Sequence, residues 1–143
     1  MPHELEFRFA AQKDVPWLAR MNRKLIRDEG HRNKMSFSEL EQRMSDFLSN
    51  EYDAVIVSSG RKDIGYVLYR KEPEWLYLRQ IFVIDKMRRK GIGRRTIEWL
   101  KENPWKDYKR IRTDVLVNNT NGINFWKAVG FEEYCITMEM ENK

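Results

Sequence analysis

An α/β (α+β) fold, with a mixed sheet flanked by helices, is predicted by two features of this sequence. Apolar residues recur at every second position in several short segments, as in strands, and at helical spacing in others. In the second half of the chain the two kinds of segment alternate, and strand–helix–strand units place their strands in parallel. The expected element order is βααβββαβαβ.

The first third of the chain predicts one strand and two helices. Leu5–Ala10 alternates as a strand does, and Asp14 is expected to cap the helix that follows. The apolar face of that helix consists of Val15, Leu18, Met21, Leu25 and Ile26. Gly30 is expected to end it. Ser36–Leu48 predicts a second amphipathic helix, whose first residue forms a capping box with Glu39.

The period of the pattern changes to two after residue 53. Three successive strands are expected at Ala54–Ser58, Ile64–Arg70 and Trp75–Ile84, with turns at Ser59-Gly60 and Glu72-Pro73. The last part of the third strand is wholly apolar, which is typical of a buried central strand.

The rest of the chain predicts two helices and two strands in alternation. A helix is expected from about Gly91 to Glu102, because Pro104 stops it. A strand at Arg110–Val117 and a short helix at Asn121–Val129 follow. The last expected strand is Glu132–Met140.

Length and composition favour one domain over residues 1–143, because two halves would each have a poor core. With a single cysteine, Cys135, no internal disulfide can form, and no apolar run is long enough to cross a bilayer. The start of the chain has no signal-peptide pattern, so we expect a cytoplasmic protein without a membrane partner. No group of His, Cys and Asp has metal-ligand spacing, so no metal is expected.

The turn at Arg88–Gly93 has the features of a phosphate site. A helix N-terminus leaves backbone N–H groups unpaired and adds about half a positive charge there. Gly91 and Gly93 remove side chains, which lets a phosphate approach those amides. The net charge of +5 is partly concentrated here, in the basic residues Arg88, Arg89, Lys90, Arg94 and Arg95. This arrangement suits a pyrophosphate.

Two nucleotide-binding motifs are excluded by the sequence of this turn. A P-loop needs GxxxxGK followed by Ser or Thr, and the chain has no such run. A dinucleotide fingerprint needs GxGxxG, and here Gly93 is followed by Arg94, Arg95 and Thr96. The turn also follows the fourth expected strand rather than the first.

The remaining pattern, Arg-x-x-Gly-x-Gly at residues 88–93, resembles the acetyl-CoA signature of the GNAT (Gcn5-related N-acetyltransferase) superfamily. A second segment supports the resemblance, in which Asn119 precedes a short helix and the pair Gly130-Phe131. The element order is similar across nearly the whole chain. The resemblance implies a centrally parallel sheet of six to seven strands with about four helices.

The resemblance also implies a function, acetyl transfer from acetyl-CoA to a primary amine of a small molecule or protein. The long strand would pair with the pantetheine arm, the helix start would hold the pyrophosphate, and Asn119 would touch the arm from the other side. The acetyl thioester would lie where the strands Trp75–Ile84 and Arg110–Val117 separate. The implied cofactor-binding residues are Ile81, Phe82, Val83, Arg88, Arg89, Lys90, Gly91, Ile92, Gly93, Arg94, Asn119 and Trp126.

Two catalytic roles follow from the same resemblance. The backbone N–H of Val83 would stabilise the developing oxyanion. Many family members protonate the leaving thiolate with a Tyr where this chain has Trp126, and an indole N–H is not a useful acid. Tyr134 could substitute for it, or the thiolate, a tolerable leaving group, could depart without a dedicated acid. The long strand contains no carboxylate, so a water chain or an amine that arrives neutral could replace the usual base.

Alternative interpretations stay open at this point. A CoA-binding module without turnover would share the same turn, and a basic nucleic-acid-binding domain would explain the net charge but not the paired glycines. Glu29, His31 and Arg32 border the region where the family binds its acceptor, and we interpret them as surface residues. Since only one strand follows Phe131, a homodimer could complete the sheet edge.

Overall fold

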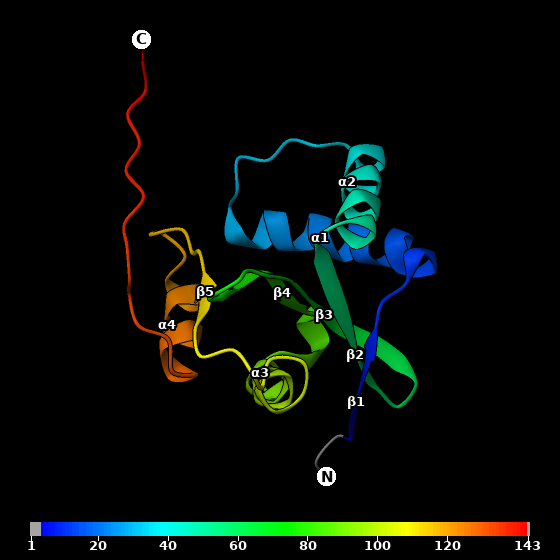
Figure 1. The fold of residues 1–143 in the computed structure, drawn as a ribbon. Coiled ribbons are helices and arrows are strands. Elements are labelled where there is room, and N and C mark those ends of the chain that lie inside the picture. Colours follow the sequence, from blue (N-terminus) through cyan, green and yellow to red (C-terminus); the bar gives the residue numbers. More distant parts are fainter. Residues whose placement is uncertain (1–3, 143) are drawn as a thin grey trace.

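The structure, a computed structural model, describes residues 4–142. Its centre is a five-stranded sheet whose strands lie side by side in chain order, as Figure 1 shows. Neighbouring strands are antiparallel except for the last two, which run parallel. The strands are β1 (Leu5–Phe9), β2 (Tyr52–Ser59), β3 (Lys62–Lys71), β4 (Leu76–Val83) and β5 (Ile111–Thr113).

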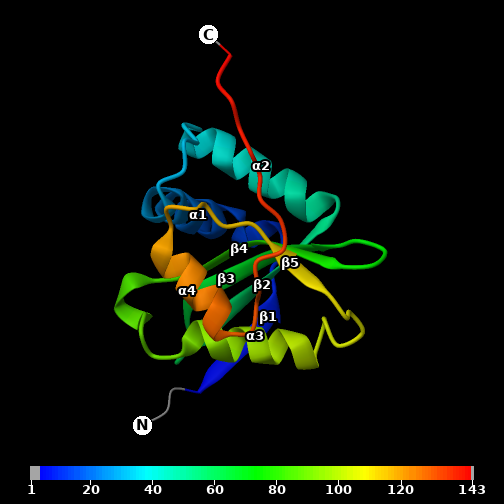
Figure 2. The same ribbon diagram turned by 90° about the vertical axis from the view of Figure 1, so that its left-hand side faces the viewer.

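Helices cover both faces of the sheet. α1 and α2 lie on one face, and α3 and α4 lie on the other (Figures 1 and 2). The bounds are α1 (Val15–Glu29), α2 (Phe37–Ser49), α3 (Ile92–Glu102) and α4 (Thr120–Ala128), with 3-10 turns η1 (Gln12–Asp14) and η2 (Asp85–Met87). The α/β architecture and the four helices agree with the prediction.

The period-two pattern of the strands divides the apolar core between the two faces. Ile56 of β2 packs toward α1, in one cluster with Leu18. Its neighbour Val55 points to the opposite face and shares a cluster with Leu100 and Trp105. Because successive side chains of a strand point to opposite faces, one buried strand supports both helical layers.

One helix start agrees with the prediction in full and the other in part. The Ser36 hydroxyl accepts a hydrogen bond from the Glu39 N–H (3.2 Å), and the Glu39 carboxylate accepts one from the Ser36 N–H (2.8 Å), which confirms the capping box. Asp14 does occupy the N-cap position of α1, but its backbone is already helical and its side chain makes no cap hydrogen bond to that helix. Its carboxylate instead accepts from the Ala11 N–H (2.9 Å) and from Arg8.

We expect Asp14→Asn to lower the free energy of unfolding by about 1 kcal/mol at pH 7, because hydrogen bonds to a charged group are lost. Arg8 donates two bonds to this carboxylate, at 3.0 and 3.1 Å, and holds the pKa of Asp14 below its usual value. A depressed folded-state pKa stabilises the fold above about pH 4 and ceases to do so as the pH falls through that pKa.

Urea denaturation of the wild type and Asp14→Asn at several pH values checks this prediction. The difference in free energy between them should shrink as the pH is lowered from 5 toward 2. A difference that is the same at pH 7 and at the lowest accessible pH would contradict the assigned role of the ion pair.

The C-terminal third differs from the expected sheet. Within residues 4–142 the sheet has five strands rather than six to seven, and only its last pair is parallel. The strand predicted at Glu132–Met140 is not formed, and the strand predicted at Arg110–Val117 is reduced to Ile111–Thr113. A strand needs a partner edge, and no strand within residues 4–142 pairs with residues 132–140, whose C-terminal end projects beyond the other elements in Figure 1.

Candidate functional site

The parallel strands β4 and β5 separate after a short pairing. Leu76, Tyr77 and Leu78 pair with residues 111–113, and the Thr113 hydroxyl donates to the Leu78 carbonyl (2.9 Å). Beyond Leu78 no strand within residues 4–142 pairs with β4 on this side. The prediction that these two strands separate is confirmed, and the separation leaves residues 79–83 with an open edge.

A β-bulge lies at the point of separation. On the β3 side, Leu68 pairs with Gln80 while Tyr69 pairs with Leu78, so Arg79 is the extra residue of β4. A bulge bends its strand and changes the direction of a side chain. Here it directs β4 away from β5 at the position where pairing stops.

The start of α3 presents unpaired backbone amides. In the part of the chain that the structure describes, no acceptor takes a hydrogen bond from the N–H groups of residues 89–94. Arg89 and Gly91 have positive φ, of 63° and 76°, and Gly91 has no neighbouring atom within 4 Å of a Cβ built on it. No side chain caps this helix. Bare amides at an open helix N-terminus are suited to bind an anion.

Two of the basic side chains at this turn hold it in place. The Arg88 Nε donates to the Val83 carbonyl (2.7 Å), and its guanidinium pairs with Asp28 of α1 (2.7 Å) and Asp85 (2.8 Å). Arg94 donates to the Ala128 carbonyl at the end of α4 (2.6 Å). These two arginines therefore connect the turn to α1 and α4, while exposed Arg89 and Lys90 form no ion pair within residues 4–142.

Gly93 has a packing role that its motif did not reveal. A Cβ there would lie 2.8 Å from Cε1 and 3.0 Å from Cζ of the Phe125 ring. We expect Gly93→Ala to destabilise the fold by about 1 kcal/mol, because overpacking costs about 1–3 kcal/mol and the better helix propensity of Ala offsets part of it. Thermal unfolding measures this loss, and Phe125→Leu in the same chain should recover it. An increase in stability for Gly93→Ala alone would contradict the contact.

The other side of the open edge is formed by α4. The Asn119 side chain accepts a hydrogen bond from the Gly122 N–H (2.9 Å) and so caps the helix. Trp126 is buried, at 9% exposed, and its ring packs against Phe125 and Phe131 with centroids 5.0 and 4.9 Å away. Asn119 thus fixes where α4 begins, and Trp126 lies at the boundary between the core and the pocket described next.

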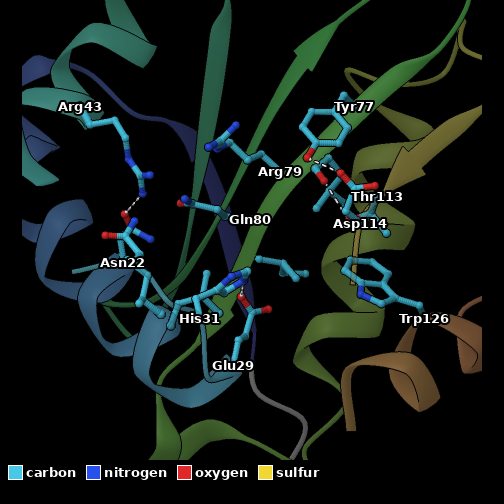
Figure 3. Close-up of a pocket in the computed structure, with 15 residues that line it drawn as sticks. Asn22, Glu29, His31, Arg43, Tyr77, Arg79, Gln80, Thr113, Asp114 and Trp126 are labelled. Atoms are coloured by element: carbon cyan, nitrogen blue, oxygen red, sulfur yellow. Dashed lines mark hydrogen bonds and ion pairs between the residues drawn. The ribbon is translucent and has the colours of Figure 1, made fainter. Parts of the chain in front are cut away.

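A pocket of about 280 Å³ opens beside the bulge of β4 (Figure 3). It lies between α1, α2 and their connection on one side, and β4, the end of β5 and α4 on the other. The residues that line it are Asn22, Leu25, Ile26, Glu29, His31, Asn33, Arg43, Tyr77, Leu78, Arg79, Gln80, Ile81, Thr113, Asp114 and Trp126. Of the cofactor-binding residues predicted from the sequence, the pocket lining includes Ile81 and Trp126.

Two polar pairs lie in the wall of the pocket. Glu29 and His31 are 3.1 Å apart, and burial raises the pKa of Glu29 although the neighbouring His31 opposes that shift. The Tyr77 hydroxyl donates to Asp114 (2.9 Å), and burial together with this bond raises the pKa of Tyr77 to about 12. Both pairs are visible in Figure 3.

The sequence did not predict most of this pocket. Glu29 and His31 line it while their side chains stay partly exposed, at 34% and 43%, as expected of surface residues. Arg32 pairs with Glu139 on the exposed surface (2.9 Å). One signal was present in the sequence. Asn22 interrupts the apolar face of α1 and is 1% exposed, and a buried polar residue on such a face marks a polar site.

Tyr134 lies apart from the pocket. Its side chain is 77% exposed, it is not among the lining residues, and its ring centroid is 4.8 Å from Cζ of Arg112. The tyrosine that lines the pocket is Tyr77. A catalytic role for Tyr134 stays a prediction.

Within residues 4–142, no group of three or more His, Cys, Asp or Glu side chains is placed to hold a metal ion. Among the helices of the same residues, none is long and apolar enough to span a bilayer.

Comparison with known proteins gives consistent results. The family model described as acetyltransferase (GNAT) family matches residues 17–131. A crystal structure described as that of a possible acetyltransferase from Clostridium difficile 630 is 20% identical, with 97% of each chain covered and a TM-score of 0.82. An aminoglycoside N-acetyltransferase determined with CoA is 14% identical over 100% of this chain and 97% of the other, with a TM-score of 0.78. A ribosomal-protein-alanine N-acetyltransferase from Brucella melitensis biovar Abortus 2308 is 12% identical over 97% and 100%, also at 0.78.

Proposed function

The chain belongs to the acetyltransferase (GNAT) family, and from this premise we propose that it moves the acetyl group of acetyl-CoA to a primary amine. One observation carries the proposal: the unpaired amides of residues 89–94 lie next to the open edge of β4, and the pocket opens at the same edge. An anion site, a backbone edge and a pocket thus adjoin one another. In acetyl-CoA a diphosphate, an amide-containing arm and an acyl group follow one another in the same order.

Each part of acetyl-CoA has a counterpart in this arrangement. The amides of residues 89–94 would bind the pyrophosphate, with exposed Arg89 and Lys90 beside it. Ile81, Phe82 and Val83 would hydrogen-bond the pantetheine arm along the open edge. Arg88 and Arg94 would act by holding the turn in place, and Asn119 by placing α4 and Trp126.

The reaction is direct attack of the amine on the thioester carbon, so that a C–N bond forms, the C–S bond breaks and CoA leaves as a thiol. Val83 would donate its N–H to the thioester oxygen, where negative charge develops. Tyr134 could protonate the leaving thiolate only if the C-terminal segment moved toward the pocket, because its side chain is 77% exposed. Most of the rate enhancement would come from positioning the two substrates.

Two measurements test this function. Acetyl-CoA at about 100 times its Kd should stabilise the protein by about 2.7 kcal/mol in thermal unfolding. With an amine acceptor present, the protein should then release free thiol. The absence of any thermal shift at millimolar acetyl-CoA would disprove the proposal, and a shift without thiol release from any amine would favour the binding module without turnover.

A second copy of this chain is the partner that we propose for residues 132–140. This extended segment has an apolar side chain at every second position, and these side chains are 77–88% exposed: Tyr134, Ile136, Met138 and Met140. An extended segment with one apolar face and an unpaired backbone favours pairing with another strand.

We expect a dimer in sedimentation experiments at micromolar concentration, with Ile136→Asp shifting the protein toward the monomer. Thr137→Asp places the same charge on the opposite face of the segment and serves as the control. A wild-type protein that is monomeric throughout the concentration range would contradict this partner.

The cytoplasm is the location that we propose for this reaction. The only cysteine, Cys135, is exposed and free, which suits a reducing compartment. Recovery of the protein in a secreted or membrane fraction would contradict this location.

A further inference from the structure

We propose that the acceptor is a primary amine that also carries a carboxylate, and that Arg43 and Arg79 bind that carboxylate in the pocket beside β4. The inference rests on the proposed acetyl transfer and names the class of acceptor. It depends on how charge and unpaired polar atoms are distributed among the residues that line the pocket.

Arg43 supplies the first part of the anion site. It reaches the pocket from α2, and its Nη2 donates to the Asn22 side-chain oxygen (2.9 Å). Its Nε has no hydrogen-bond partner, nor does Nδ2 of Asn22, although both atoms are buried. Asn22 itself is 1% exposed. Buried donors without acceptors are costly, so a ligand oxygen placed here would be strongly favoured.

Arg79 supplies the second part. As the bulge residue of β4 it turns its guanidinium toward Arg43 and Asn22, as Figure 3 shows. The guanidinium carbons of Arg43 and Arg79 lie 5.4 and 4.9 Å from the centre of the same Phe47 ring. Arg79 also donates to the Tyr52 hydroxyl (3.3 Å). Two positive groups therefore converge on one side of the pocket.

No carboxylate of the described residues lies within ion-pair distance of either cation. None of the ion pairs within residues 4–142 includes Arg43 or Arg79. Burial, followed by the nearby charge of Arg79, lowers the pKa of Arg43. A carboxylate from the ligand would neutralise the pair and accept hydrogen bonds from both guanidinium groups.

The pocket lining also includes the charge that an amine requires. Glu29 lies at the end of α1, and Asp114 follows β5, and both line the pocket. A carboxylate attracts an ammonium group and can take up the proton that the amine loses when it attacks. The lining thus contains two cations and, unpaired with them, two carboxylates. This combination of charges favours a zwitterionic acceptor over one that carries only amines.

Paired acceptors test the inference. Each ω-amino acid with two to five methylene groups is compared with the alkylamine that lacks its carboxylate, by kcat/KM for thiol release. In the wild type the amino acid of the best-fitting length should be preferred about 10-fold or more, mainly through KM. Equal values of kcat/KM within every pair would overturn the inference while leaving acetyl transfer intact.

Variants that remove a charge test whether the two arginines cause the preference for acceptors with a carboxylate. Arg79→Gln should reduce the preference for the carboxylate to about 2-fold or less, and Arg79→Lys should retain part of it. Arg43→Gln should reduce the preference in the same way. Because Arg79 is exposed, its substitution should not disturb the packing of the core. Arg20→Gln removes a charge from an exposed α1 position outside the pocket and should leave the preference unchanged. An unchanged preference in both Arg79→Gln and Arg43→Gln would overturn the assignment.

Binding without turnover separates this inference from the proposed function. Calorimetry with the same amino acids and alkylamines, in the presence of CoA, needs no reaction. Tighter binding of the amino acids, lost in Arg79→Gln, supports the anion site even if no acceptor releases thiol. Equal binding of both members of every pair would overturn it even if acetyl transfer occurs.

Discussion

Gly91→Asp is expected to weaken acetyl-CoA binding about 100-fold. The carboxylate would lie at the start of α3, within a few ångströms of the pyrophosphate that the amides of residues 89–94 are proposed to bind. Two like charges about 4 Å apart repel by about 1–4 kcal/mol near a protein surface, and 100-fold corresponds to about 2.7 kcal/mol. Calorimetric titration with acetyl-CoA measures the effect.

Gly91→Asn is the matched control. Asn and Asp have nearly the same shape, and both tolerate the left-handed conformation that Gly91 adopts at φ 76°. A Cβ at this position meets no atom within 4 Å, so both variants should fold with similar stability. Gly91→Asn should bind acetyl-CoA at least ~10-fold more tightly than Gly91→Asp. Equal affinities would mean that no negative ligand group approaches this helix start.

Trp105→Ala is expected to have the largest effect on stability, a loss of about 3–5 kcal/mol. Trp105 is 1% exposed and belongs to the cluster that joins Leu100 of α3 to β4. Its ring packs edge-on against Tyr69 of β3, with centroids 5.3 Å apart. Removing it would leave a cavity under α3 and loosen the helix whose N-terminus forms the anion site. Chemical denaturation of the wild type and the variant measures the loss.

Trp99→Ala provides the comparison. Trp99 lies on the same helix and stacks on Phe7 at 4.6 Å, but it is only partly buried. Trp99→Ala should therefore lower the free energy of unfolding by about half as much as Trp105→Ala. Trp105→Phe should also cost less, because it keeps an aromatic ring in the cluster. If Trp105→Ala were no more destabilising than Trp99→Ala, the central role of Trp105 in the core beneath α3 would be contradicted.

Local patterns in the sequence predicted most of the fold. The alternation in residues 54–84 gave three strands with correct neighbours, and the Ser36–Glu39 pattern gave a helix start with both of its hydrogen bonds. The strand at Glu132–Met140 has an equally clear alternation, but a strand also requires a partner edge. Which edges are available depends on the whole fold, so that prediction failed.

The candidate site was predictable only where it is a local motif. The turn at Arg88–Gly93 is contiguous, and its glycines and helix start could be identified from spacing alone. The packing of Gly93 against Phe125 could not, because the two residues are 32 positions apart. The pocket is assembled from five separated segments, and the approach of Arg43 to Arg79 across it depends on the bulge in β4.

The central claim is that bare amides at the start of α3 bind the pyrophosphate of CoA. The most direct test is a titration of the ¹⁵N-labelled protein with CoA, in which each backbone amide is followed by NMR. The amides of residues 89–94 should show the largest shifts, followed by those of residues 79–83 along the open edge of β4. Saturable binding that leaves the amides of residues 89–94 unshifted would contradict the claim.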